Sequence, residues 1–257
     1  ELAEARMRLE IARTAEAAAE VAARLIATVL GIALGRRPRA SLALSGGSSP
    51  LPMLRALARE SLDWSSVHVY QVDERVVARG DSARNLGALD EILVWGGPLP
   101  RRNLHPMWVD RSDLESAAAD YAAEVAQVAG DPPVIDVVHL GLGGDGHTAS
   151  LFPGDPVLAV QDRSVAITGE HNGHRRMTLT YPVLNRARSV VWFITGEDKA
   201  GIVADLYAGG APFPAGRVAR TRAVLVADQA AGQEALVPRR RRRKAQRRVV
   251  VPLRPRE

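Results

Sequence analysis

The chain has 257 residues, of which 46% are hydrophobic and 25% charged, and it contains no cysteine. This composition is ordinary for a globular protein and excludes disulfides, thiol nucleophiles and cysteine-ligated metals. No apolar run approaches the roughly 20 residues of a membrane span. The charged first ten residues do not resemble a signal peptide. We therefore expect a cytoplasmic protein without a membrane partner, and the start at Glu1 predicts missing N-terminal residues.

The positive charge is concentrated at the C-terminus. The formal net charge is +5, but residues 237–257 hold ten Lys or Arg and one Glu, a net charge of +9. Residues 1–236 therefore carry about −4. Blocks of like charge stay disordered, so we expect a disordered basic tail. A nucleic-acid arm is the alternative, but no aromatic residue lies among the basic ones to stack on bases, and we expect no nucleic-acid partner.

The first elements lead to a glycine- and serine-rich loop. Residues 2–34 are rich in Ala, Glu, Arg and Leu and predict one long helix or two shorter ones. Residues 40–44 predict a strand and residues 51–60 a helix. The loop between them holds Gly46, Gly47, Ser48 and Ser49, whose free N–H groups before a helix suit a phosphate. A tight turn that binds nothing is the alternative, and a P-loop is excluded because Gly-Lys-Ser/Thr is missing.

A second strand, over residues 67–72, ends in three charged residues. Asp73, Glu74 and Arg75 follow it directly. Such a triplet is usually a surface ion-pair cluster. Its position at a strand end, on the same edge as the glycine loops, makes a functional role equally plausible.

The remaining elements continue an alternation of strands and helices, which predicts an α/β fold with a doubly wound, mostly parallel sheet flanked by helices. We see no internal repeat or interior linker, so residues 1–236 are expected to form a single domain. Helices are predicted over residues 86–95, 110–129, 183–187, 197–207 and 229–236. Strands are predicted over 103–107, 134–140, 164–168, 175–182, 189–195 and 223–226, of which 103–107 is an edge strand or connector and 175–182 is half-buried.

The loop over residues 141–153 is the strongest functional signal. It follows the predicted strand 134–140, and ligands bind outside the carboxyl ends of strands in open α/β sheets. Four glycines allow the backbone to turn sharply and approach a ligand, and the only titratable groups are Asp145 and His147. An imidazole titrates near working pH, so His147 is a candidate general base. A structural role, capping the loop, is the alternative.

Other chemistries fit this loop less well. Its G-x-G-x-x-G spacing matches a dinucleotide fingerprint, but Pro153 and Pro156 leave little room for the required helix. No G-x-S-x-G elbow of a serine hydrolase is present. No cluster of metal ligands is apparent either: His171 and His174 lack companion acids and are expected to be solvent-exposed, and His139 is expected to be a satisfied histidine of the sheet or core.

The chain carries four motifs in order: residues 45–50, Asp73-Glu74-Arg75, 141–153 and 176–180. Together they resemble the motifs of 6-phosphogluconolactonases, from about residue 10 to about residue 236. The most specific piece is Asp145-Gly146-His147-Thr148-Ala149-Ser150-Leu151-Phe152-Pro153. Glucosamine-6-phosphate deaminases share the Ser-Gly-Gly loop and the Asp-Gly-His core but continue differently after the histidine. Ser49 stands where the family usually has Thr, and the family pattern stops after Leu236.

The resemblance implies a hydrolase without metal or cofactor that opens 6-phosphoglucono-δ-lactone to 6-phosphogluconate in the pentose phosphate pathway. His147 would take a proton from the attacking water, and Asp145 would orient its ring. The phosphate would lie against residues 46–49. The alternatives are a glucosamine-6-phosphate deaminase and a non-catalytic sugar-phosphate-binding protein, in either case a monomer or homodimer. Further substrate contacts would come from Asp73, Arg75, Arg176 and Lys199, and oxyanion donors from Gly143, Gly144 and Gly146.

Overall fold

The computed structural model describes residues 7–237, which form a seven-stranded sheet and a smaller three-stranded sheet. All neighbouring strands of the large sheet are parallel, in the order β1-β10-β9-β6-β2-β3-β5. The predicted mostly parallel α/β fold is thereby confirmed. All but the first residue of the predicted basic tail lies outside the described residues. The large sheet consists of β1 (Arg8–Ala12), β2 (Ala40–Leu44), β3 (Val67–Gln71), β5 (Leu104–His105), β6 (Val137–Leu140), β9 (Val190–Ile194) and β10 (Ala223–Asp228).

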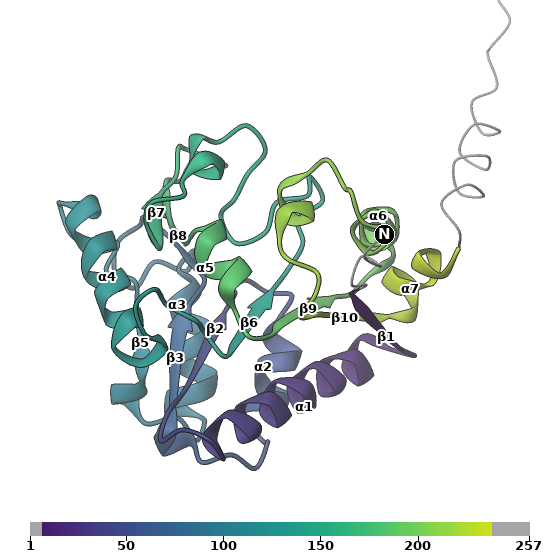
Figure 1. Ribbon diagram of the computed structural model, residues 1–257, viewed down its shortest axis with the longest axis horizontal. Coiled ribbons are helices and arrows are strands. Elements are labelled where there is room, and N and C mark those ends of the chain that lie inside the picture. The colour runs from purple at the N-terminus through teal and green to yellow at the C-terminus, as the bar shows by residue number, and fades with distance from the viewer. Residues whose placement is uncertain (1–6, 238–257) are drawn as a thin grey trace, which may run out of the picture.

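Helices cover both faces of this sheet, and each face buries its own hydrophobic cluster. One face packs against α1 and α2, and the other against α4, α5 and α6 (Figure 1). Two-sided burial explains why these strands are nearly continuous apolar runs rather than alternating ones. The helices are α1 (Ala15–Leu34), α2 (Leu51–Leu57), α3 (Asn85–Leu89), α4 (Leu114–Ala129), α5 (Tyr181–Arg186), α6 (Ala200–Ala208) and α7 (Gln229–Gly232).

The N-terminal segment differs from the prediction of helix over residues 2–34. Arg8–Ala12 forms β1, which pairs in parallel with β10 at the edge of the sheet. Helix α1 begins only after Thr14, whose side chain accepts a hydrogen bond from the N–H of Ala17. Helix-favouring composition was overridden at β1 by pairing with a strand more than 200 residues away, which local propensity does not register. A smaller difference occurs at residues 86–95, where α3 is followed by a π-helical segment, Asp90–Trp95.

The small antiparallel sheet was not predicted as a separate unit. It consists of β4 (Asp73–Arg75), β8 (Arg176–Leu179) and β7 (Val165–Ile167), with β8 in the middle. Strand β8 is fully buried and not half-buried. Its pairing places Arg75 opposite Arg176 and Asp73 opposite Thr178, at the carboxyl end of β3.

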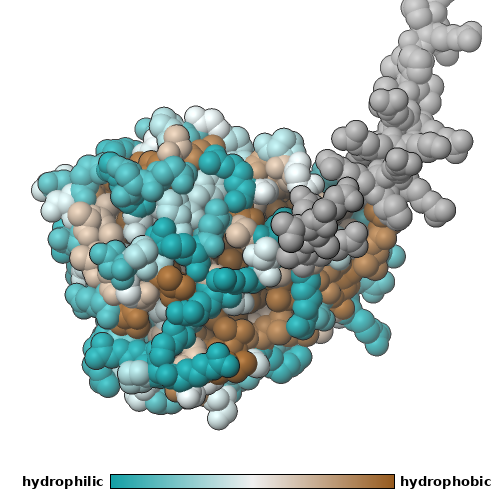
Figure 2. Space-filling view, in the orientation of Figure 1, coloured by the Kyte–Doolittle hydropathy of each residue, from teal (hydrophilic) through white to brown (hydrophobic). Residues whose placement is uncertain are grey.

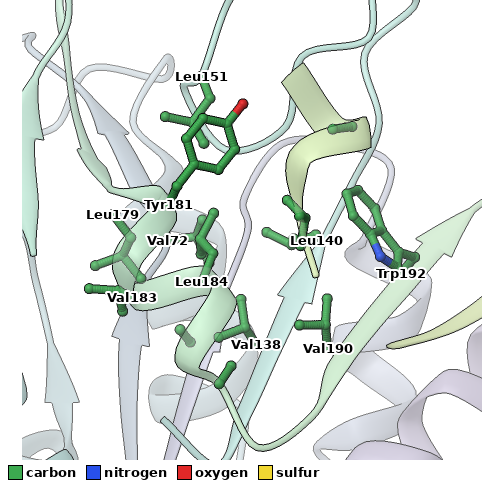
Figure 3. Close-up of a cluster of buried hydrophobic side chains, with 14 of the residues drawn as sticks. Val72, Val138, Leu140, Leu151, Leu179, Tyr181, Val183, Leu184, Val190 and Trp192 are labelled. Atoms are coloured by element: carbon green, nitrogen blue, oxygen red, sulfur yellow. The ribbon is translucent and has the colours of Figure 1, made fainter. Parts of the chain in front are cut away.

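A shared core joins the two sheets beneath the loop over residues 141–153. Figure 3 shows side chains of β6, β8, α5 and β9 gathered in this core. Leu151 of the loop is fully buried and belongs to the same cluster as Leu140, Leu179 and Tyr181. The loop is therefore anchored at its far end by a buried leucine as well as by its strand.

Helix α1 is the one described helix that is long and apolar enough to cross a membrane, contrary to the expectation that no run approached that length. Its apolar character has an explanation within the fold, because one side of the helix is buried on the large sheet. Apolar residues also reach the surface near α1, along the lower right of Figure 2. The buried residues are Ala18, Ala19, Ala22, Ala23, Ile26, Ala27, Leu30 and Ala33.

Candidate active site

The candidate site lies at the carboxyl ends of four adjacent strands, β9, β6, β2 and β3. The chain runs from β2 outward to β3 and β5, and then returns to β6 on the other side of β2. This reversal between β2 and β6 is the switch point at which open α/β sheets bind ligands. The loops that leave β2 and β6 therefore face each other across a crevice.

A pocket of about 270 Å³ fills this crevice. Its size suits a small ligand, since pockets for larger, drug-sized ligands span roughly 300–1,000 Å³. Among the residues predicted to act together, it is lined by Gly46, Gly47, Ser49, Asp73, Arg75, Gly143, His147, Arg176 and Lys199.

The turn before His147 is closed by its own backbone. The N–H of Gly143 donates to the carbonyl of His147 (2.9 Å), and the N–H of Gly146 donates to the carbonyl of Gly143 (3.0 Å). Gly146 has φ +84°, and a Cβ there would strike the ring of Phe213. Thr148 then donates its hydroxyl to the carbonyl of Gly141 (2.8 Å), which fastens the end of the turn to its start.

His147 lines the pocket and forms a hydrogen-bonded pair with Asp145, which does not line it. His147 Nδ1 lies 2.5 Å from Asp145 Oδ1, which also accepts the N–H of His147 (3.1 Å). Partial burial raises the pKa of Asp145, but the hydrogen bonds from His147 outweigh it and hold this pKa below its usual value. An ionised Asp145 fixes the proton on Nδ1, which leaves Nε2 as the acceptor. The imidazole is about one-third exposed, so it is reachable from the pocket.

The glycine- and serine-rich loop after β2 forms the opposite wall. Gly46 packs so closely on Asn85 that a Cβ would overlap its side chain, and Gly47 has φ +92°. Ser45 donates its hydroxyl to the carbonyl of His139 (3.0 Å), which ties this loop to β6. Ser48 does not line the pocket with its neighbours but faces an adjoining surface groove.

Asp73 supplies a buried carboxylate to the pocket. It accepts a short hydrogen bond from the Ser150 hydroxyl (2.5 Å). Burial raises its pKa, while the Ser150 hydrogen bond and the charges of Arg176 and His147 oppose that rise. Asp73 thus joins the loop after β6 to the small sheet.

Glu74 has a structural role rather than that of a surface ion pair. Its side chain is fully buried and accepts the N–H groups of Asn85 (2.8 Å) and Leu86 (2.9 Å) at the start of α3. Gln71 and the N–H of Arg75 also donate to it. The charged triplet therefore has two roles: Asp73 and Arg75 line the pocket, and Glu74 holds the start of α3.

Three cationic side chains surround the pocket. Arg75 donates to the carbonyl of Ala83 (2.7 Å), which fixes one edge of its guanidinium. Arg176 is largely buried, with its Cζ 4.8 Å from the ring centre of Phe152. Lys199 lies at the start of α6 and points over Gly144. Their charges converge from β4, β8 and the segment after β9.

The predicted oxyanion donors are not all arranged as expected. Gly143 lines the pocket, but its N–H is used within the loop, as is that of Gly146. Gly144 and Gly146 do not line the pocket. The tight turn that presents His147 uses the N–H groups of Gly143 and Gly146 for its own hydrogen bonds, which the glycine spacing alone does not reveal.

Two histidines differ from their predicted environments. His139 is buried and lines the pocket, but neither ring nitrogen has a hydrogen-bond partner among the described residues, so it is not a satisfied core histidine. Burial lowers its pKa to about 3. His171 does have a companion acid, because its Nε2 lies 2.6 Å from Asp155 Oδ2. Because sixteen residues separate His171 from Asp155, the sequence alone did not indicate this pair.

Other lining or supporting residues were not singled out from the sequence. Ser150 and Phe152 lie within the predicted motif, yet nothing in its pattern assigned them contacts to Asp73 and His147. Asn85, the first residue of α3, is another such residue. Its amide donates to the carbonyl of Asp73 (3.0 Å), which fastens α3 to β4.

Comparisons with known proteins agree with the motifs. A model of the family described as glucosamine-6-phosphate isomerases/6-phosphogluconolactonase matches residues 13–227. The 6-phosphogluconolactonase of Synechocystis sp. is 40% identical over 192 residues, covering 71% of this chain and 78% of that protein. That of Streptomyces coelicolor is 35% identical over 246 residues, covering 88% and 94%.

Solved structures agree as well. The 6-phosphogluconolactonase from Thermotoga maritima has a TM-score of 0.76 at 25% identity, covering 86% of this chain and 99% of that one. A monomeric glucosamine-6-phosphate deaminase shares the fold, with a TM-score of 0.77 at 19% identity and coverage of 89% and 100%. The family predicted from the loop motifs is thus confirmed: the chain belongs to the glucosamine-6-phosphate isomerase/6-phosphogluconolactonase family.

Proposed function

We propose that this protein hydrolyses 6-phospho-D-glucono-1,5-lactone to 6-phospho-D-gluconate. The observation that carries the proposal is the single pocket in which the His147 imidazole faces the glycine- and serine-rich loop and three cations. Relatives that are named 6-phosphogluconolactonases support the same activity.

In the proposed reaction, His147 Nε2 takes a proton from water as the water oxygen attacks the lactone carbonyl carbon. The ring C–O bond of the resulting tetrahedral intermediate then breaks, and the ring oxygen leaves as a hydroxyl after receiving that proton. The new carboxylic acid ionises and releases a proton to solvent. Asp145 keeps the imidazole in the reactive tautomer throughout.

The phosphate is proposed to lie against Gly46, Gly47 and Ser49. Arg75, Arg176 and Lys199 would neutralise its charge, since charge-assisted hydrogen bonds are about twice as strong as neutral ones. Holding this end of the substrate positions the carbonyl carbon at His147. Asp73 would accept a hydrogen bond from a sugar hydroxyl.

The direct test is acid release from freshly prepared 6-phosphogluconolactone, measured against the spontaneous hydrolysis blank. The proposal predicts acceleration proportional to the enzyme concentration. A deaminase would instead release ammonia from glucosamine 6-phosphate, and a sugar-phosphate sensor would bind without turnover. Ammonia release without lactone hydrolysis would overturn the proposal.

We also propose that the enzyme works in the cytoplasm, as a monomer or homodimer, and without nucleic acid. Deleting residues 239–257 separates the catalytic role from a binding role of the basic segment. Lactone hydrolysis should be unchanged by the deletion. Salt-dependent binding to DNA that disappears with these residues would contradict the exclusion of nucleic acid.

A further inference from the structure

The ring of Phe152 packs against both the candidate base and a second histidine. Its centre lies 4.4 Å from that of His147 and 4.3 Å from that of His171. The His171 ring is nearly parallel to it, at 15°, and the His147 ring is tilted by 30°. Phe152 is itself buried. The position of one histidine ring is therefore coupled to the other through a close-packed aromatic stack.

His171 is held firmly by a buried carboxylate. Its Nε2 lies 2.6 Å from Oδ2 of Asp155, a carboxylate with only 1% side-chain exposure. Asp155 is itself fixed, because it accepts the N–H groups of Val157 (2.8 Å) and Gly169 (2.9 Å). The backbone of His171 also pairs with that of His174 (3.0 and 3.2 Å). The position of the His171 ring is therefore fixed by the buried carboxylate of Asp155.

His147 is held less firmly. Asp145 is half exposed, and its Oδ1 bonds to the backbone N–H and to Nδ1 of the same histidine. This pair sets the tautomer, but both partners belong to one glycine-rich turn. The face of Phe152 is a contact to the imidazole from outside the turn, and a misplacement of about 1 Å at a catalytic group can cost 100-fold in rate.

We propose that His171 is a positioning residue for His147, acting through the ring of Phe152. The proposal rests on the proposed role of His147 as the general base. Without the His171 ring, Phe152 loses one of its packing partners and can tilt away from His147. Arg176 also lies on Phe152, but it bonds to the backbone carbonyl of His171 (3.4 Å), which side-chain variants leave in place. The effect should therefore fall on kcat more than on KM.

Three variants separate the ring contact from the hydrogen bond. His171→Asn removes the ring and should lower kcat about tenfold while KM changes less than about threefold. His171→Phe keeps a ring against Phe152 and loses the bond to Asp155; it should restore kcat to within about threefold of the wild type. His174→Asn, in the same hairpin, is the matched control and should leave both constants unchanged.

The imidazole signals of His147 in ¹H–¹⁵N NMR spectra give a readout that does not require turnover. The ring current of Phe152 should shift these signals in the wild type and in His171→Phe, and the shift should shrink in His171→Asn. Unchanged His147 signals in His171→Asn would overturn the proposal even if the protein hydrolysed no lactone. Equal losses of kcat in His171→Asn and His171→Phe, or unfolding of the former alone, would also overturn it, because the role would then lie in hairpin stability.

Discussion

The parallel sheet and the small antiparallel sheet supply different groups to the same pocket. The parallel sheet contributes strand-end loops: the Ser45 to Ser49 segment and the turn that presents His147. The antiparallel sheet contributes charged side chains, the carboxylate of Asp73 and the guanidinium groups of Arg75 and Arg176. The first set acts through backbone shape and one imidazole, and the second through charge. The two should therefore respond differently to substitution.

The strongest disturbance should come from filling the turn on the parallel-sheet side. In Gly143→Ala, the new Cβ would overlap Nδ1 of His147 and lie 2.7 Å from Asp145 Oδ1. We expect kcat to fall at least about 100-fold, because the imidazole must move. Gly31→Ala in α1 is the control: its Cβ meets nothing within 4 Å, and we expect normal turnover with about 0.5–1 kcal/mol more stability. Normal turnover in Gly143→Ala would contradict the geometry.

Removing a charge from the small sheet should reduce activity less than Gly143→Ala does, and mainly by raising KM rather than by lowering kcat. Arg176→Gln should lower kcat/KM about 10- to 100-fold, mainly through KM, because a hydrogen bond to a charged group contributes about 1.5–3 kcal/mol. Arg175→Gln, next to it but exposed, is the matched control and should be close to wild type. Steady-state kinetics at two ionic strengths would check this, and equal effects in both variants would argue against a specific phosphate contact.

The hydrogen bond from Ser150 to Asp73 connects the loop after β6 to the small sheet, and its contribution to stability should depend on pH. Burial raises the pKa of Asp73, so its ionised form disfavours folding once the pH exceeds the unfolded value of about 3.9. Ser150→Ala removes the hydroxyl that offsets this, and we expect a loss of about 1–3 kcal/mol at neutral pH. Thermal unfolding should show a smaller loss in acid. If the loss stayed pH-dependent in an Asp73→Asn background, another group would be responsible.

The smallest effect is expected at His139 of β6, which lines the pocket. Its pKa of about 3 in the fold is below the usual 6.5, so the unfolded chain takes up a proton first as the pH falls. The free energy of unfolding is therefore not reduced by His139 above about pH 6.5. Between pH 6.5 and pH 3 it falls, by at most about 1.4 kcal/mol per pH unit. His139→Leu should stabilise the protein by about 1 kcal/mol at pH 7, because it removes an unpaired buried imidazole, and by more at pH 5. Urea titrations at both pH values would check this, and a destabilised variant would show that the ring is paired.

The parallel sheet and its loops could be predicted from the sequence more fully than the antiparallel sheet. Strand, loop and helix follow one another locally in the parallel sheet, so the loops around Gly46 and His147 were recognisable from adjacent residues. The antiparallel sheet pairs Asp73 with Thr178 across about 100 residues, and strand β1 pairs with β10 across more than 200. No local pattern encodes such pairings. For the same reason, the contacts of Ser150 with Asp73 and of His171 with Asp155 became visible only in the fold.

The central claim is that the His147 imidazole is the proton acceptor facing an anion-binding loop, and its removal is the most direct test. The rate of lactone hydrolysis by His147→Ala should be compared with that of the wild type at equal concentration, each corrected for the spontaneous reaction. A general base contributes about 10²–10⁴-fold, so we predict a loss of that size with the fold intact by circular dichroism. Turnover by folded His147→Ala at the wild-type rate would contradict the account.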